Sequence, residues 1–156
     1  MPDFAELLSR FTDAACRGDG DGVADCFTED GVYHDVFYGA FRGRDELKDM
    51  IENRFHRDGE AFRWDMRDIV ESNDRGYARY LFSYRSRKAG ADARRSVFEG
   101  VVIARLESGL IAEYDELANP YTGLALMGLS DEKIAGFAKK QTEALRARPE
   151  AARHFA

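Results

Sequence analysis

Two carboxylates are the side chains in this sequence best suited to chemistry. Asp35 lies within residues 32–38, a run rich in β-branched and aromatic side chains, and Glu116 follows Tyr114 in a second such run. A carboxylate held in an apolar pocket has a raised pKa, because burial disfavours its charged form, and it then accepts protons near neutral pH. A structural role stays open for each: Asp35 caps a turn or pairs with an arginine, and Glu116 pairs with a basic side chain such as Arg79.

The sequence carries none of the motifs of nucleotide-dependent chemistry or covalent acyl transfer. It has no P-loop, no GxGxxG turn, no GxSxG elbow and no Cys–His pair at nucleophile spacing. The three histidines, His34, His56 and His154, are not at metal-ligand spacing. Since His34 is adjacent to Asp35, the two face opposite sides of a strand, and we expect His34 outside any site. We therefore expect no metal and no cofactor.

The charge of the chain argues against two classes of partner. The formal net charge is −6 over 156 residues, whereas nucleic acids and anionic membranes bind a dense positive surface. One local group of basic residues surrounds Gly90, and we interpret it as the solvated turn of a hairpin rather than an anion-binding patch. These residues are Arg85, Arg87, Lys88, Arg94 and Arg95.

The N-terminal segment MPDFAELLSRF contains acidic residues and no long apolar run. This composition indicates neither a signal peptide nor a membrane span. We therefore expect no membrane partner and a cytoplasmic location.

Helical periodicity appears in four segments. Apolar side chains at i, i+3, i+4 and i+7 predict a first helix over residues 3–17, and a Gly-rich turn then leads into a short second helix that ends near Thr28. A third helix is predicted from Gly43 to about His56, with acidic residues in its first turn. Ser130 can cap a final helix.

Extended segments predict five strands, the first over residues 32–38. The other four are separated by short turns, which makes them an antiparallel meander over residues 61–70, 77–87, 96–106 and 110–118. The helices ahead of this meander must cover one of its faces. The opposite face carries Val97, Val101 and Ile103, and because an uncovered apolar sheet surface needs a partner, we expect a homodimer.

These elements indicate an α+β fold. A chain of 156 residues has room for one core, so we expect one domain over residues 1–156. The core of that domain covers about residues 4–120, and a C-terminal helical extension covers about residues 130–147.

The order of these elements resembles the nuclear transport factor 2-like superfamily and its SnoaL-like members. The resemblance spans about residues 4–120 and rests on Gly18-Asp19 before the second helix, on TEDGVYHD ending at Asp35, on FRGRDEL opening the third helix, and on GLIAEYDE ending at Glu116. It implies a cone-shaped, strongly curved mixed β-sheet packed on the N-terminal helices. The open end of the cone is a mostly apolar pocket in that superfamily.

The resemblance also assigns roles to the two carboxylates. In ketosteroid isomerase-like members, the position that Asp35 matches carries the carboxylate that shuttles a proton. Glu116 matches the acidic position that follows a Tyr or His in SnoaL-like proteins, and alternation along the last strand turns it to the same side as Tyr114. Two carboxylates in one cavity divide acid and base duties, because their repulsion retains one proton on the pair. Asp35 and Glu116 are the predicted catalytic residues.

Aromatic side chains are predicted to line the pocket, with ordinary core packing as the alternative role for most of them. The predicted ligand-binding residues are Phe11, Tyr33, Trp64, Tyr80, Phe98 and Tyr114. Phe11 argues against a ketosteroid isomerase, because it occupies the position of an oxyanion-hole tyrosine and cannot donate a hydrogen bond. The second oxyanion donor of those enzymes, an acid, aligns with Val102.

Three functions remain open on these grounds, because one fold hosts many chemistries. The first is an isomerase, cyclase or hydrolase that moves a proton or adds water on a small hydrophobic carbonyl or epoxide compound. The second is a module that binds a small hydrophobic molecule without converting it. The third is a dimerisation domain whose cone is filled by its own side chains.

Overall fold

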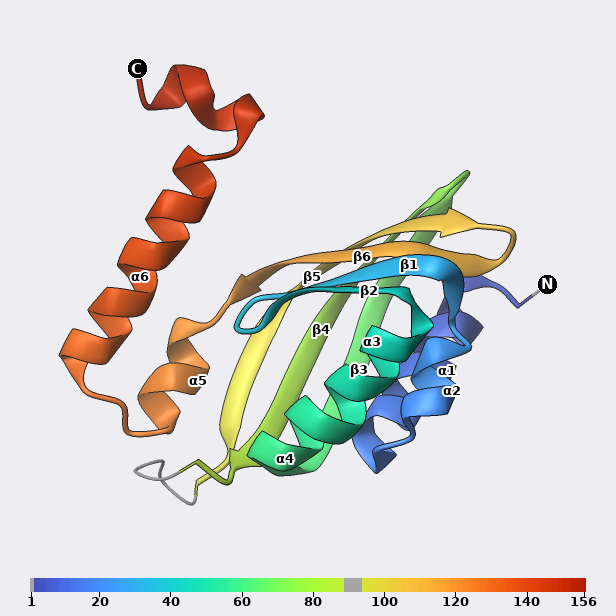
Figure 1. Cartoon of the computed structure of the whole chain (residues 1–156), viewed down its shortest axis with the longest axis horizontal. Helices are drawn as coiled ribbons and strands as arrows, with labels where there is room; N and C mark the ends of the chain where they lie inside the picture. Colours follow the sequence, from blue (N-terminus) through green and yellow to red (C-terminus); the bar gives the residue numbers. More distant parts are fainter. Residues whose placement is uncertain (1, 89–93) are drawn as a thin grey trace.

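The computed structural model describes residues 2–88 and 94–156 and contains the predicted helices and strands together with further short elements (Figure 1). The helical elements are α1 (Phe4–Arg17), α2 (Gly20–Ala24), α3 (Gly43–Met50), a π-helical turn (Ile51–Phe55), α4 (His56–Asp58), α5 (Tyr121–Leu126), α6 (Asp131–Arg146) and a 3-10 turn (Pro149–His154). The strands are β1 (Phe27–Asp35), β2 (Gly39–Arg42), β3 (Gly59–Ser72), β4 (Arg75–Ser86), β5 (Ser96–Glu107) and β6 (Leu110–Asn119).

The strands form one six-stranded sheet in the order β2-β1-β6-β5-β4-β3. The pairings along β3, β4, β5 and β6 are antiparallel, which confirms the predicted meander. Strand β1 joins this meander by parallel pairing with β6, and β2 pairs antiparallel with β1 at the edge. The sheet is therefore mixed, and the predicted α+β class with a C-terminal helix is confirmed.

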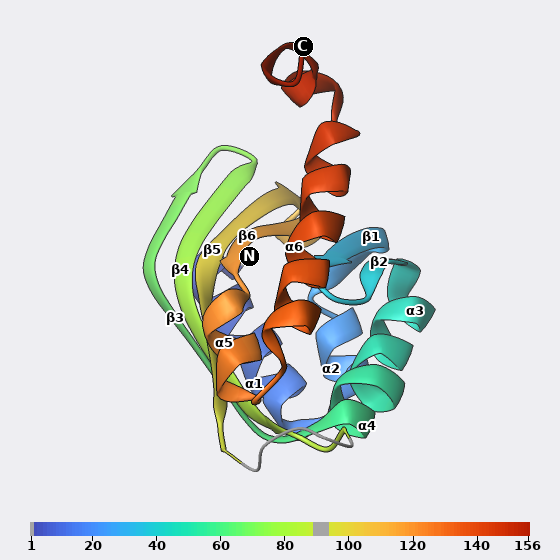
Figure 2. The ribbon, with the colours of Figure 1, turned by 90° about the vertical axis from the view of Figure 1, so that its left-hand side faces the viewer.

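Two bulges in β3 bend the sheet toward the helices. The pairing of β3 with β4 shifts register at two places, beside Ala61 and beside Asp68. Both residues have φ near +50°, at 55° and 52°, in the left-handed region that residues with side chains rarely adopt. Such bulges bend a strand and increase its twist. The result is the curved wall in Figure 2, with the N-terminal helices on its concave side.

Helix α1 forms where its apolar stripe was predicted. Asp3 caps its start by accepting a hydrogen bond from the backbone N–H of Glu6 at 2.8 Å. The stripe of Phe4, Leu7, Leu8 and Phe11 is buried. Helix α1 packs against the edge strand β3, so this stripe forms part of the core on the concave side of the sheet.

The region between α2 and α3 differs from the prediction. Strand β1 begins at Phe27, where a helix end was expected, because Phe27 pairs with Ile111 of β6. The strand ends at Asp35 instead of continuing to residue 38, and β2 was not predicted. Gly39 has φ of 88°, which lets the chain reverse between the two strands.

The C-terminal segment adds a second unpredicted element, α5. Gly123 of this helix lies directly against the ring of buried Phe98. Helix α6 was predicted, and none of its residues is buried. Its Phe137 ring contacts Phe37 at 5.4 Å between centroids, and the rest of the helix extends away from the sheet (Figure 1).

The sequence also led to expectations about the basic segment around Gly90 and about membrane-spanning helices. The tip of the basic hairpin around Gly90 lies outside the described residues. Among the described residues, no helix is both long and apolar enough to cross a membrane.

The packing of α5 on Phe98 predicts opposite effects of one substitution at two helical glycines. A Cβ at Gly123 would lie 2.1 Å from Cζ of Phe98, whereas a Cβ at Gly136 in α6 meets nothing within 4 Å. We expect Gly123→Ala to lower the free energy of unfolding by about 1–2 kcal/mol through overpacking. Gly136→Ala, the control, should raise it by up to about 1 kcal/mol through helix propensity. Urea denaturation of both variants measures this, and a neutral Gly123→Ala would contradict the described packing.

Candidate functional site

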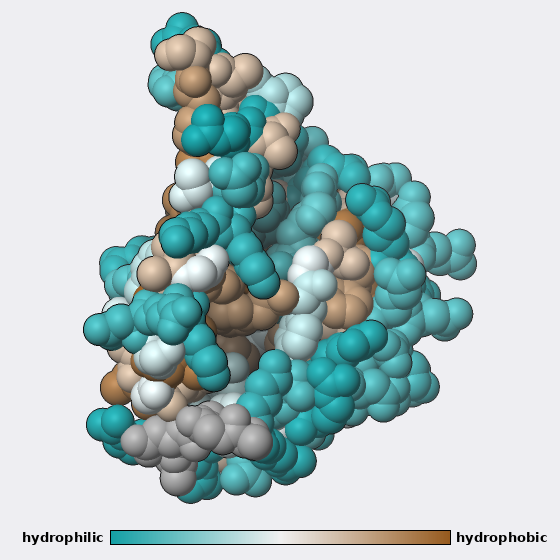
Figure 3. Space-filling model, turned by 60° about the vertical axis from the view of Figure 1, so that its left-hand side comes forward, coloured by the Kyte–Doolittle hydropathy of each residue, from teal (hydrophilic) through white to brown (hydrophobic). Residues whose placement is uncertain are grey.

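The concave side of the sheet holds an open cavity of about 320 Å³. It lies between β-strands, the helical run that ends in α4, and the segment from α5 to the start of α6. Figure 3 shows it as a hollow with hydrophobic walls beside the C-terminal helix. Its aromatic lining consists of Tyr33, Phe37, Tyr38, Phe55, Phe62, Trp64, Tyr80, Phe82, Tyr84 and Phe98. The cone is therefore not filled by its own side chains.

Asp35 is held in the cavity wall by the turn that follows β1. Its Oδ1 accepts hydrogen bonds from the backbone N–H groups of Phe37 at 2.8 Å and Tyr38 at 2.9 Å. These bonds make Asp35 the cap of the turn, which is one of the two roles left open by the sequence. The same side chain lines the cavity, so the capping role orients the carboxylate rather than removing it from the site.

Glu116 reaches the same cavity from the neighbouring strand. Strands β1 and β6 run parallel, with Tyr33 opposite Tyr114. Two residues further along each strand come Asp35 and Glu116, on the same face because side chains alternate with a period of two. Both line the cavity. Arg79 pairs with Asp68 at 3.3 Å, not with Glu116.

The two carboxylates have no cationic partner within ion-pair distance among residues 2–88 and 94–156. Burial raises the pKa of Asp35, while its two backbone hydrogen bonds oppose that rise. Burial also raises the pKa of Glu116, and the negative charge of Asp35 raises it further, to about 8. The surroundings therefore favour the protonated form at Glu116, whereas the two N–H donors favour the charged form at Asp35.

Tyr80 completes the polar end of the cavity. Its hydroxyl faces the Glu116 carboxyl group, and this contact opposes the rise that burial causes in the pKa of Glu116. Gly100 of β5 makes room for this hydroxyl, since a Cβ there would lie 2.6 Å from the Tyr80 oxygen. Burial and the nearby Glu116 raise the pKa of Tyr80, which keeps the phenol protonated and able to donate.

The structure divides the predicted ligand-binding residues into two layers. Tyr33, Trp64, Tyr80 and Phe98 line the cavity. Phe11 and Tyr114 are fully buried and lie behind this layer, with Tyr33 stacked on Tyr114 at 4.7 Å between ring centroids. In the described part of the chain, the Tyr114 hydroxyl and the Trp64 indole nitrogen are buried without a hydrogen-bond partner. Phe11 and Tyr114 thus support the cavity floor.

Several lining residues were not predicted, because long-range packing brings them to the cavity. The sequence pattern places Phe55 on the apolar stripe of a helix. This pattern does not indicate that the C-terminal end of the helix borders a cavity. Leu124, Met127 and Lys133 come from the segment after the sheet. The sequence offers no signal for their position, since α5 itself was not recognised.

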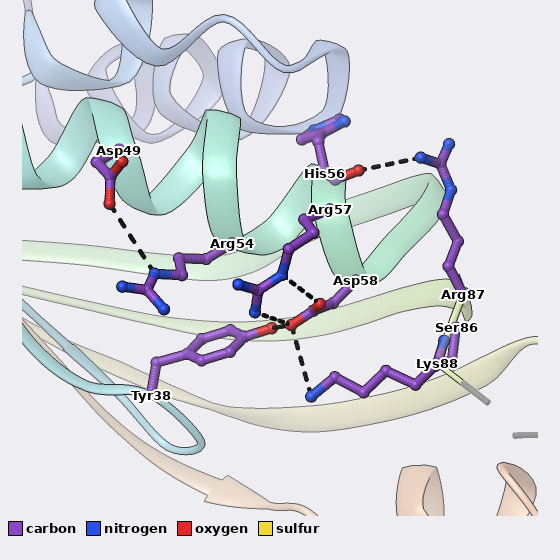
Figure 4. A network of polar contacts seen from close by, with 9 residues as sticks. All are labelled: Tyr38, Asp49, Arg54, His56, Arg57, Asp58, Ser86, Arg87 and Lys88. Carbon is purple, nitrogen blue, oxygen red and sulfur yellow. Dashed lines mark hydrogen bonds and ion pairs between the residues drawn. The ribbon is translucent and has the colours of Figure 1, made fainter. Parts of the chain in front are cut away.

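A network of polar side chains forms one side of the cavity mouth (Figure 4). The Tyr38 hydroxyl donates a hydrogen bond to Oδ2 of Asp58 at 2.5 Å. Arg57 donates to both Asp58 oxygens at 2.7 and 2.9 Å, and Nζ of Lys88 lies 3.5 Å from the same carboxylate. These partners hold the pKa of Asp58 well below its usual range. Because Tyr38 belongs to the turn that Asp35 caps, this network fixes that turn to α4.

His34 lies outside the cavity, as its position beside Asp35 predicted. Its Nε2 is 2.9 Å from Oε1 of Glu113. Among the described residues, no three His, Cys, Asp or Glu side chains gather as a metal-ligand set.

Comparison with known proteins supports the fold at several levels. The SnoaL-like domain family matches residues 8–114. A protein with a ketosteroid isomerase-like fold from Catenulispora acidiphila, solved with trimethylamine, superimposes with a TM-score of 0.73 at 16% identity, covering 81% of this chain and 95% of that one. No curated protein matches the chain.

Two further solved structures carry names of enzymes. A putative polyketide cyclase from Xanthomonas campestris has a TM-score of 0.62 and 22% identity, covering 79% of this chain and 95% of that one. An epoxide hydrolase from M. tuberculosis has a TM-score of 0.63 and 15% identity, covering 78% and 86%. At these low sequence identities, the similarity shows a shared fold but does not show a shared activity. Because the family match covers more than half of the residues, the chain belongs to the SnoaL-like domain family.

Proposed function

We propose that this chain is a cofactor-independent acid–base enzyme that acts on a small apolar molecule bearing a carbonyl or epoxide group. One observation carries this proposal: two carboxylates on adjacent strands face one apolar cavity without a cation between them. Burial raises the pKa of both groups, that of Glu116 to about 8, and two backbone N–H donors oppose the rise at Asp35 alone. This difference in surroundings favours Glu116 as the acid and Asp35 as the base.

We assign a role to each carboxyl group from its surroundings. The Asp35 carboxylate removes a proton from the carbon next to a carbonyl, or from a water that attacks an epoxide carbon. The Glu116 carboxyl donates its proton to the oxygen that gains negative charge, which becomes an enol or an alcohol. The Tyr80 hydroxyl keeps Glu116 in place. Transfer of the proton from Asp35 to Glu116 then restores the starting state of both groups.

This assignment does not describe a ketosteroid isomerase. The residue at the expected oxyanion-donor position is Phe11, and its ring packs in the core against Trp64 at 5.0 Å between centroids. Val102, at the second donor position, is fully buried. Glu116 is the protonated group in the cavity, so it takes over the donor role.

A second candidate is a binding module for an alkylammonium ion. Two carboxylates without a cation, surrounded by aromatic rings, fit such an ion, and the similar protein from Catenulispora acidiphila was solved with trimethylamine. We prefer the enzyme for two reasons. The proton on Glu116 already neutralises one charge, and Lys88 and Lys133 at the cavity mouth repel a cation.

We also propose a homodimer formed by the outer face of the sheet. Large hydrophobic side chains are exposed there on three adjacent strands: Tyr77, Leu81, Val101, Ile103 and Leu117. Val101 lies opposite Leu117 in the sheet, so the two form one continuous patch. An isologous interface of two such patches would remove this surface from water.

The acid–base proposal is tested with 5-nitrobenzisoxazole, a neutral carbon acid. Removal of its ring proton breaks the N–O bond and releases a coloured phenolate. We expect the wild-type protein to accelerate this reaction, and Asp35→Asn to lower kcat/KM roughly 100-fold. Asp65→Asn serves as the control, because Asp65 is exposed on the opposite face of β3 beside Trp64. If the probe binds but wild type and Asp35→Asn turn it over at the same rate, the proposed enzyme activity is contradicted and the binding module is favoured.

The dimer is tested by light scattering after size exclusion. Leu117 is 70% exposed on the sheet, and Leu145 is 44% exposed on α6. We expect Leu117→Lys to convert a dimer to a monomer, because a lysine would be buried in the interface. Leu145→Lys should leave the dimer intact. A monomeric wild-type protein, or dissociation caused only by Leu145→Lys, would show that the sheet is not the interface.

A further inference from the structure

The mouth of the cavity carries charges opposite in sign to those at its inner end. Asp35 and Glu116 form the inner end, whereas Lys88 and Lys133 line the mouth. Aromatic side chains lie between the two ends. The whole chain has a net charge of −6, so this pair of lysines is a local exception.

Among residues 2–88 and 94–156, the two lysines of the mouth have one paired carboxylate between them, that of Asp58. Lys88 shares the Asp58 carboxylate with Arg57 (Figure 4), so two cations face one anion. Lys133 makes no ion pair with any described residue. The Lys88 side chain is 62% exposed, although Asp58 is only 13% exposed, so the Lys88 ammonium group is accessible to a ligand at the mouth while it faces Asp58.

The position of Lys133 does not serve the stability of its helix. It lies in the first turn of α6, which begins at Asp131 and is capped by Ser130. The partial positive charge at a helix N-terminus disfavours a cation there. Lys133 faces the cavity instead, where the same partial charge would add to its attraction for an anion.

Lys133 also lies outside the part of the chain that is common to the family. The family match ends at residue 114, and the mouth is completed by residues after it. The contact of Phe137 with Phe37 holds the start of α6 over the cavity. The C-terminal segment therefore adds a second lysine, Lys133, to Lys88, which lies within the matched residues.

From these observations we propose that the cavity binds an amphipathic anion. The apolar body of the ligand lies against the aromatic walls, and its carboxylate, sulfonate or phosphate group contacts Lys88 and Lys133 at the mouth. This orientation also keeps the anionic group away from Asp35. The inference deepens the proposed function and rests on it, because it names the class of substrate that the same cavity takes.

Two fluorescent dyes that differ by one charged group test the proposal. 1-Anilinonaphthalene-8-sulfonate carries a sulfonate, and N-phenyl-1-naphthylamine has the same rings without it. We expect Lys133→Gln and Lys88→Gln each to weaken binding of the sulfonate dye roughly fivefold, and to leave binding of the neutral dye unchanged. Added salt should reduce the preference for the sulfonate dye. Lys139→Gln, on the exposed side of α6, is the matched control and should change neither dissociation constant.

Three results would overturn the proposal. In the first, the lysine variants weaken the binding of both dyes equally. In the second, both variants bind the sulfonate dye as tightly as the wild-type protein does. In the third, the wild-type protein does not bind the sulfonate dye. The melting temperature of each variant shows that the fold is intact. The reaction of 5-nitrobenzisoxazole tests the enzyme separately. Selective binding of the sulfonate dye without turnover would support the anion site and reject the enzyme. Turnover without selective binding would support the enzyme and reject the anion site.

Discussion

The parallel pairing of β1 with β6 is the contact on which the site depends. It joins two segments that are far apart in the sequence, whereas the other pairings connect strands that follow each other in the chain. Because the strands are parallel and Tyr33 lies opposite Tyr114, Asp35 and Glu116 emerge side by side on the concave face. The bulges of β3 curve the opposite wall of the sheet, so the cavity forms directly in front of these two carboxylates.

Two carboxyl groups in a largely apolar cavity are costly unless their charge is reduced or stabilised. Here Asp35 is stabilised by two backbone N–H groups, and Glu116 is neutralised by a proton. The asymmetry follows from local structure: the turn after β1 supplies N–H donors to Asp35, whereas no backbone N–H of β6 donates to the side chain of Glu116. Local backbone geometry thus separates an acid from a base.

The sequence predicted what depends on local periodicity and failed where long-range packing decides. The stripe of α1 and the four strands of the meander follow from side-chain patterns, and Asp35 and Glu116 were selected because they match acidic positions of the family that the sequence resembles. Strand β2 and helix α5 were missed. Each is short, and each is stabilised by contacts such as that of Gly123 with Phe98, which no local pattern encodes. For the same reason, Phe11 and Tyr114 were assigned to the lining but lie behind it.

Direct titration of Glu116 tests the central claim that the carboxylate pair holds a proton at neutral pH. Carbon-13 NMR of the side-chain carboxyl groups, with Glu116→Gln used to assign the signal, reports the protonation of this residue. The account predicts a midpoint near pH 8, and a lower midpoint in Asp35→Asn, because the repulsion from Asp35 is removed. A midpoint close to the ordinary value of 4.5 would contradict the account, since Glu116 would then have no proton to donate at neutral pH.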